Sequence, residues 1–206
     1  MKLKVALVAL AMSTALAGCT FDSMPLVTAN YGAQRDLGYA LPAIPIYKVP
    51  AQYRRQVVRY DTSEKPGTIV VDTSKKFLYF ILPDGKAVRY GIGVGREGFE
   101  WKGTARVAMK REWPTWTPPG AMIKRQPELA KWAGGQPGGL MNPLGARALY
   151  LYNKGGDSGY RLHGTPEWWS IGKAMSSGCI RLMNQDIIDL YKRVRPGKGA
   201  RVVVQQ

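Results

Sequence analysis

The chain has 206 residues, which is enough for one domain of ordinary size with a tail and too short for two large domains. A hydrophobic fraction of 45% and a charged fraction of 21% are typical of a globular protein and exclude a wholly disordered chain or a polytopic membrane protein. The formal net charge of +16 indicates an anionic partner, either nucleic acid or an envelope rich in phosphate and carboxylate.

Residues 1–19 have the composition of an export signal. Lys2 and Lys4 make its start positive, and residues 5–16 form a mostly apolar run. The run is too short to span a bilayer, which requires about 20 residues, but it suits a signal-peptide core. It ends in Leu16-Ala17-Gly18-Cys19. This box resembles the lipobox of bacterial lipoproteins, in which the cysteine is acylated and becomes the mature N-terminus.

The resemblance implies a signal peptide over 1–18 and a lipid on Cys19, so that the protein is anchored at the periplasmic face of the cell envelope and nucleic acid is no partner. Thr20 rather than aspartate follows the cysteine, which by the same resemblance favours the outer membrane. The alternative is an ordinary cleaved signal peptide with an incidental cysteine. With Cys19 lipidated, Cys179 has no partner within the chain, and a reactive role explains it better than a leftover thiol.

Residues 19–66 are predicted to form a lipid-anchored, proline-rich tether between the membrane and the domain. Its prolines are Pro25, Pro42, Pro45, Pro50 and Pro66. Part of the tether is expected to pack on the domain through Ile44, Ile46, Tyr47 and Val49, with a small helix considered around Ala51–Tyr60.

Residues 67–206 are predicted to form one domain built mostly of strands. Apolar, β-branched and aromatic runs between turn residues predict strands at Thr68–Asp72, Lys76–Leu82, Ala87–Val94, Ala105–Met109, Ala148–Tyr152, Tyr160–His163 and Ala200–Val204. Pro83-Asp84-Gly85 is a strong turn signal and joins the second and third of these runs as a hairpin. The fold class is therefore mainly β.

One helix is predicted after the cysteine, with Asn184 as its cap and Pro196-Gly197 as its end. Its apolar positions recur at helical spacing at Ile187, Leu190, Tyr191 and Val194. A second short helix is predicted at Pro127–Trp132, within a long irregular segment at 111–145. A segment of that length in a small domain is usually a functional loop or lid, so we expect it to lie over a cleft.

Cys179 and His163 are the residues best suited to chemistry. His163 is the only histidine of the chain and stands at the end of a predicted strand, and Cys179 follows 16 positions later, before the predicted helix. A free thiol with a pKa of about 8.5 is only slightly ionised at neutral pH, so an imidazole within hydrogen-bond reach is needed to take its proton. The same imidazole can return that proton to a leaving amine. The pair predicts acyl transfer by a cysteine nucleophile.

The sequence around this pair resembles the signature of the L,D-transpeptidases of the YkuD type. The signature runs from His163-Gly164 through Ser176-Ser177-Gly178-Cys179-Ile180-Arg181. Further similarity lies at Val70–Asp72, Phe77–Tyr79, Gly91–Gly95 and Gly138–Leu149. The resemblance covers about residues 67–204 and implies a β-sandwich-like domain with one or two short helices. It differs at Ser177, where many members have histidine.

The resemblance also implies the roles of individual residues. Cys179 corresponds to the nucleophile, His163 to the general base and acid, and Gly164 to the residue whose carbonyl orients the imidazole. Backbone groups around Ser177 and Gly178 correspond to an oxyanion hole.

Substrate-binding residues are expected beside the pair. Ser176 and Arg181 adjoin the cysteine in the signature, and the planar fork of the arginine suits a substrate carboxylate. Trp113 and Trp116 either line the cleft or form a hydrophobic plug on one face of the domain. No cofactor is expected, and one histidine with one unlipidated cysteine does not make a closed metal site.

Three functions follow in order of preference. The first is a peptidoglycan L,D-transpeptidase that forms an acyl-enzyme from a tetrapeptide stem, with loss of the terminal D-alanine, and passes it to an amine. The amine would belong to another stem, giving a 3–3 cross-link, or to an envelope protein. The second is a hydrolase on the same scaffold that cleaves stem peptides or releases wall-bound protein. The third is a non-catalytic, wall-binding lipoprotein.

Overall fold

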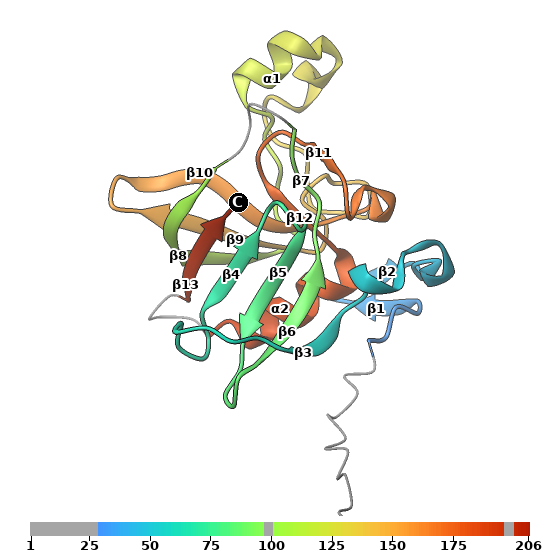
Figure 1. Cartoon of the computed structure of the whole chain (residues 1–206). Coiled ribbons are helices and arrows are strands. Elements are labelled where there is room, and N and C mark those ends of the chain that lie inside the picture. Colours follow the sequence, from blue (N-terminus) through green and yellow to red (C-terminus); the bar gives the residue numbers. More distant parts are fainter. Residues whose placement is uncertain (1–28, 97–100, 196–199) are drawn as a thin grey trace, which may run out of the picture.

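A long mixed sheet organises the parts of the chain that the computed structural model describes, which are residues 29–96, 101–195 and 200–206 (Figure 1). Within these residues the sheet has nine strands. In spatial order they are β12 (Ile180–Met183), β10 (Gly156–Thr165), β9 (Arg147–Asn153), β8 (Gly103–Glu112), β13 (Arg201–Gln205), β4 (Ile69–Asp72), β5 (Phe77–Ile81), β6 (Lys86–Gly91) and β3 (Gln56–Arg59).

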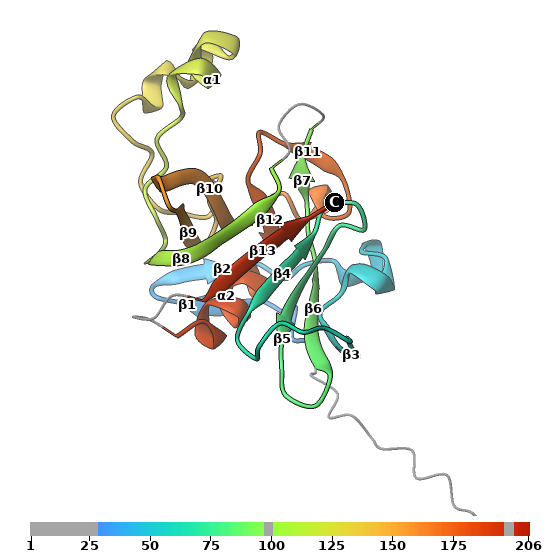
Figure 2. The same cartoon turned by 60° about the vertical axis from the view of Figure 1, so that its left-hand side comes forward.

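The sheet folds back on itself, so that its two halves share one core. Figure 2 shows β8, β9 and β10 on one side, β4, β5 and β6 on the other, and β13 between them. Buried side chains of both halves form one cluster, which includes Leu78 and Tyr90 from one half and Leu149 and Leu162 from the other. An isolated bridge joins Gly93, just beyond β6, to Arg181 of β12, so the two halves of the sheet also meet through the backbone. This arrangement confirms the prediction of a mainly β, sandwich-like fold.

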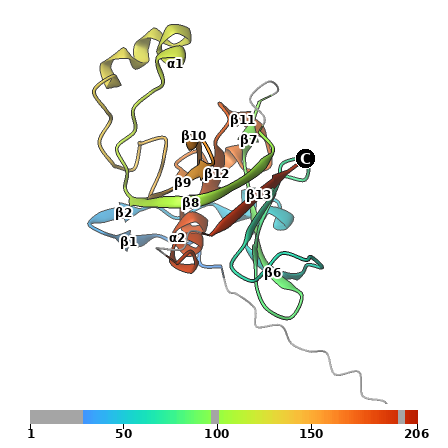
Figure 3. The ribbon, with the colours of Figure 1, turned by 90° about the vertical axis from the view of Figure 1, so that its left-hand side faces the viewer.

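The predicted helix after the cysteine is α2 (Asn184–Arg193), which packs on β9 and β10 (Figure 3). Ile187, Leu190 and Val194 are buried in the shared core, as their spacing predicted. Asn184 is the first helical residue rather than the cap, because its side-chain Oδ1 accepts a hydrogen bond from the backbone N–H of Ala146 at 2.9 Å. The predicted stop at 196–197 lies outside the described residues.

The strand predicted at Ala87–Val94 is two strands. β6 ends at Gly91, and β7 (Val94–Gly95) pairs instead with β11 (Ala174–Ser176) in a separate small sheet. A side chain at Gly91 would lie 2.5 Å from the backbone oxygen of Tyr53, so only glycine permits this close crossing. The other predicted strands are present with ends that differ by a few residues.

The described part of the predicted tether is packed on the domain. It contains β1 (Gln34–Asp36), β2 (Tyr39–Leu41), two short 3₁₀ helices (Ile46–Lys48 and Ala51–Tyr53) and β3. The helix considered over Ala51–Tyr60 is therefore only one turn, because the β-branched residues that follow pair with β6 at the edge of the sheet.

The expected packing positions of this segment are mostly confirmed. Val49 is buried, and Ile44 and Ile46 pack against the same cluster. Tyr47 does not pack, since it is 78% exposed.

The long segment at 111–145 forms an arm. Its tip carries α1 (Gly120–Arg125) and a 3₁₀ helix at the predicted Pro127–Trp132, and it projects away from the body of the domain (Figures 2 and 3). A bridge between Trp116 and Gln136 closes its base. Across 29–96, 101–195 and 200–206, no helix has the length and apolar character needed to cross a membrane.

Candidate active site

Two adjacent parallel strands bring the predicted catalytic residues together. Leu162 of β10 lies opposite Ile180 of β12, and His163 lies opposite Arg181. Leu162 and Ile180 point into the shared core, so the alternation of a strand turns His163 and Arg181 to the other face.

Arg161 and Cys179 precede the core pair by one residue on each strand and share this second face. We name Arg161, His163, Cys179 and Arg181 the catalytic face. By continuation of the register, His163 and Cys179 occupy one diagonal of this face and Arg161 and Arg181 the other.

The imidazole of His163 is buried, with 4% of the residue exposed. Its Nδ1–H donates to the backbone oxygen of Gly164 at 2.6 Å, so Nε2 is the nitrogen that can accept a proton. Burial lowers the pKa of His163 to about 4, the charges of Arg181 and Arg161 act in the same direction, and the Gly164 carbonyl opposes them. The imidazole is therefore neutral at physiological pH and available as a base.

The backbone around Gly164 is held on several sides. A side chain at Gly164 would lie 2.3 Å from Asn184 Oδ1 and 2.9 Å from Ile187 Cγ2. One at Gly145, whose φ is +61°, would lie 2.2 Å from the same Asn184 oxygen. These close approaches fix the carbonyl that orients His163.

Cys179 is half-buried and is the one free cysteine among the described residues. Burial raises the pKa of its thiol, whereas a backbone hydrogen bond with Arg161 and the charges of Arg161 and Arg181 lower it. Because the net direction is upward, the resting site holds a neutral thiol beside a neutral imidazole. Ionisation then requires transfer of the thiol proton within the site.

The turn before Cys179 is braced by Ser176, which is 2% exposed. Its hydroxyl donates to the backbone oxygen of Cys179 at 2.6 Å and accepts from the N–H of Gly178 at 3.2 Å. Gly178 has a φ of +111°, which favours glycine. The hydroxyl of Ser176 is thus engaged in the turn, and an oxyanion role for the N–H of Gly178 requires release of its bond to Ser176. Ser177 is exposed beside them.

Arg181 is only partly free for a substrate. Its Nη1 donates to Oε2 of Glu167 at 2.8 Å, and its Nε is buried without a hydrogen-bond partner among the described residues.

The two tryptophans lie in different surroundings. Trp113 is 9% exposed, stacks on Tyr39 at 4.0 Å between ring centroids and donates from Nε1 to Asp36 at 2.8 Å. These contacts join Trp113 to the hairpin formed by β1 and β2. The backbone of Trp116 pairs with Gln136 in the base of the arm.

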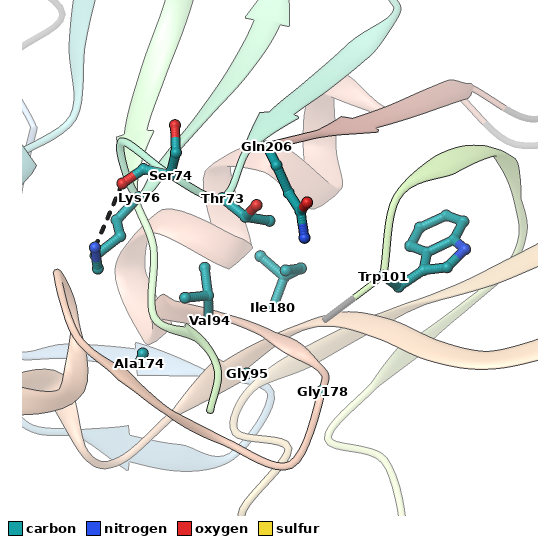
Figure 4. A pocket seen from close by; sticks show the side chains of 10 residues that line it. All are labelled: Thr73, Ser74, Lys76, Val94, Gly95, Trp101, Ala174, Gly178, Ile180 and Gln206. Carbon is teal, nitrogen blue, oxygen red and sulfur yellow. Dashed lines mark hydrogen bonds between the residues drawn. The ribbon is translucent and has the colours of Figure 1, made fainter. Parts of the chain in front are cut away.

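A cavity of about 330 Å³ lies on the core side of β12, beside the turn that carries the thiol (Figure 4). Val94 and Ile180 form its apolar floor, and Gly178 is part of its wall. Trp101 at its rim stacks on Tyr160 at 5.1 Å.

Sequence reasoning missed four residues of this region: Tyr150, Asp157, Arg161 and Glu167. The position of Arg161 was available, because it lies two residues before His163 in a strand and therefore points to the same face. The partners Asp157, Tyr150 and Glu167 come from other segments and leave no comparable signal. No group of acidic, histidine and cysteine side chains suited to a metal ion exists within the described residues.

A cysteine and a histidine, carried by neighbouring strands of a bent β-sheet with a backbone carbonyl behind the imidazole, form a candidate site for acyl transfer. Residues 66–204 match the family model YkuD, described as an L,D-transpeptidase catalytic domain. The chain belongs to this L,D-transpeptidase family.

Individual relatives agree with this assignment. The chain is 36% identical over 160 residues to the "Probable L,D-transpeptidase ErfK/SrfK" of Escherichia coli K12, a match that covers 73% of this chain and 48% of that protein. It is 30% identical to a "Putative L,D-transpeptidase in ATP synthase subunits region ORF 5" of Fuscovulum blasticum, covering 80% of this chain and 88% of that one. The chain therefore spans about half the length of its Escherichia coli relative.

A solved structure from Brucella melitensis is similar as well. It is described as a "Probable carnitine operon oxidoreductase caia" and has 45% sequence identity, a TM-score of 0.52, and coverage of 74% of this chain and 95% of that one.

Proposed function

We propose that this protein is a peptidoglycan L,D-transpeptidase in which Cys179 accepts a tetrapeptide stem as a thioester and passes it to an amine. The observation that carries the proposal is the catalytic face, where a neutral buried imidazole and a neutral thiol lie on one diagonal of two paired strands. The match of residues 66–204 to the L,D-transpeptidase domain supports the substrate class.

The first half-reaction is acylation. Nε2 of His163 takes the thiol proton while the sulfur of Cys179 attacks the carbonyl that precedes the terminal D-alanine. The tetrahedral intermediate collapses, the imidazolium gives its proton to the leaving amine, and D-alanine departs. The Gly164 carbonyl at 2.6 Å from Nδ1 keeps the ring oriented through both proton transfers. A thioester and free D-alanine are the products.

The second half-reaction repeats the chemistry in reverse. An acceptor amine attacks the thioester, His163 takes the proton that the amine loses, and the thiol is restored as the new amide forms. The low pKa of His163 helps the ring to give up its proton in each half-reaction, and it makes the uptake of a proton from the thiol or the amine correspondingly more costly. With water as the acceptor, the same steps hydrolyse the peptide.

The site of action that we propose is the cell envelope. The export signal at 1–18 and the lipobox ending at Cys19 support anchoring of the chain by a lipid at the periplasmic face, with the outer membrane favoured. The positive net charge of +16 is compatible with a polyanionic wall. The amine that accepts the stem belongs to a second stem peptide or to an envelope protein.

The experiment uses the full chain carrying Cys19→Ser, which prevents lipidation, and disaccharide tetrapeptides as donor. Mass spectrometry of the products is expected to show dimers that lack one D-alanine, and Cys179→Ala is expected to give none. If the products are tripeptides without dimers, the protein is a hydrolase rather than a transpeptidase. If the tetrapeptide is unchanged after incubation with the protein that retains Cys179, the proposed activity is refuted.

A further inference from the structure

Arg161 occupies a position that the mechanism above does not use. It lies on the catalytic face, one register step before the Leu162–Ile180 pair, and is therefore the cross-strand neighbour of Cys179. Its backbone forms a hydrogen bond with the thiol, and its charge lowers the pKa of both His163 and Cys179. The charge of its side chain thus acts on both groups of the proposed reaction.

The guanidinium of Arg161 is held rigidly by three contacts. Nη1 and Nη2 donate to the two carboxylate oxygens of Asp157 at 2.6 Å and 2.7 Å. The remaining N–H of Nη1 donates to the backbone oxygen of Tyr160 at 2.9 Å. The plane lies over the ring of Tyr150, 4.3 Å from its centroid. These contacts remove most of the rotational freedom of a long side chain.

One edge of this guanidinium remains available. Asp157 takes the edge formed by Nη1 and Nη2, so Nε–H and the second hydrogen of Nη2 form no hydrogen bond within the described residues. Together these two groups make the other planar fork of an arginine, which matches both oxygens of a carboxylate. The side chain of Arg161 as a whole is 17% exposed, so it is mostly withdrawn from water without being sealed from it.

Arg181 is arranged differently. It forms one hydrogen bond with Glu167, its Nε is buried, and it lies opposite His163 rather than Cys179. A carboxylate near the carbonyl that Cys179 attacks is therefore better placed for the fork of Arg161.

We propose that Arg161 is a specificity-determining residue, which binds a carboxylate of the acyl-donor peptide through its Nε and Nη2 groups and so holds the scissile carbonyl over Cys179. The ligand class is an acidic peptide, and the inference rests on the proposed function for the identity of that peptide. Asp157 and Tyr150 are positioning residues, because they act on the donor only by fixing the guanidinium.

The test compares donors that differ only in one carboxylate. Tetrapeptides with each carboxylate amidated in turn, the terminal one included, are offered to the full chain carrying Cys19→Ser, and release of the last residue is measured as kcat/KM. Hydrogen bonds to charged groups contribute enough for a preference of about 10- to 100-fold for the acid over one of the amides. In the Arg161→Gln variant this preference should be lost, so that the acid and the amide react with about equal kcat/KM.

Two further variants separate the effect of the planar hydrogen-bonding edge of Arg161 from the effect of its positive charge. Arg161→Lys keeps the charge without the planar edge and should retain only a small part of the preference. Asp157→Asn leaves the arginine in place but loosens it, which should raise KM for the acid more than for the amide. Arg59→Gln removes an exposed arginine on β3 and serves as the matched control, with the preference unchanged.

The inference is overturned if Arg161→Gln slows the acid and its amides by the same factor, since the side chain would then support only folding or thiol ionisation. Binding of the same peptides to Cys179→Ala protein, measured by calorimetry, keeps this test independent of turnover. If Cys179→Ala protein binds the acid more tightly than its amides and the added Arg161→Gln removes this difference, the inference is supported. This holds even if no donor is turned over, because the absence of turnover would contradict only the proposed function.

Discussion

The burial of Asp186 leads us to predict an unusual dependence of the protein's stability on pH. The carboxylate is fully buried between α2 and the N-terminal segment. It accepts a hydrogen bond from the hydroxyl of Tyr31 at 3.2 Å, and Nη1 of Arg55 lies 3.7 Å from Oδ1, which has no hydrogen bond within the described residues. Burial raises the pKa of Asp186 from 3.8 to about 7, and Arg55 and Tyr31 only partly oppose this.

The direction of the effect follows from which state binds the proton more tightly. The folded protein keeps Asp186 protonated to a higher pH than the unfolded chain does, so the resulting stability is complete below pH 3.8 and is lost as the pH rises to about 7. Because one pKa unit corresponds to about 1.4 kcal/mol, the difference between 3.8 and about 7 amounts to about 4 kcal/mol.

Urea denaturation of the protein and of Asp186→Asn between pH 4.5 and 8 measures this term. Subtracting the two unfolding free energies removes the titration of all other groups, and the asparagine mimics the protonated acid. We expect the protein to lose about 3 to 4 kcal/mol relative to Asp186→Asn across this range. A difference that is constant with pH, or that grows in favour of the aspartate, would show that Arg55 holds the carboxylate as an ordinary ion pair.

Three further predictions concern the site and its support. Cys179→Ala and His163→Ala should each abolish turnover to the same background in the muropeptide assay, because the two side chains act as one unit. Gly164→Ala places a methyl group 2.3 Å from the neighbouring asparagine oxygen and should lower kcat at least tenfold with smaller change in KM, since it displaces the carbonyl behind the imidazole. Asp36→Ala removes both short bonds to Arg147, at 2.7 Å and 2.8 Å, and should lower the unfolding free energy by about 3 to 5 kcal/mol in urea denaturation.

The controls for these variants come from the same chain. Gly139→Ala introduces the same methyl group where no atom lies within 4 Å, and it should leave kcat unchanged. Glu128→Ala removes an exposed carboxylate on the arm and should change stability by less than about 0.5 kcal/mol. Full activity of Gly164→Ala would contradict the positioning role of the carbonyl. An unchanged unfolding midpoint of Asp36→Ala would contradict a stabilising role of the Asp36–Arg147 pair. Residual turnover in only one of Cys179→Ala and His163→Ala would contradict the prediction that the two side chains act as one unit.

The sequence by itself predicted the chemistry of the site. His163 and Cys179 are recognisable because each is the sole candidate of its kind outside the lipobox, and the local pattern around them is short and specific. The strands and α2 were also predictable from local sequence, because apolar periodicity and turn residues are signals that extend over only a few positions. Gly164 as the partner of the imidazole lies directly beside His163 in the chain.

Only the tertiary structure decided how these parts are supported. Trp113 is turned to Asp36 by a hairpin 77 residues away, and Asp186 is buried by Tyr31 across 155 residues, so neither environment has a local signal. The same holds at Gly91, where β6 ends and a side chain would lie 2.5 Å from the backbone oxygen of Tyr53, a residue 38 positions away in the chain. Burial, and with it the pKa of His163, Cys179 and Asp186, depends on which distant segments exclude water, and that is a property of the packed molecule rather than of any stretch of sequence.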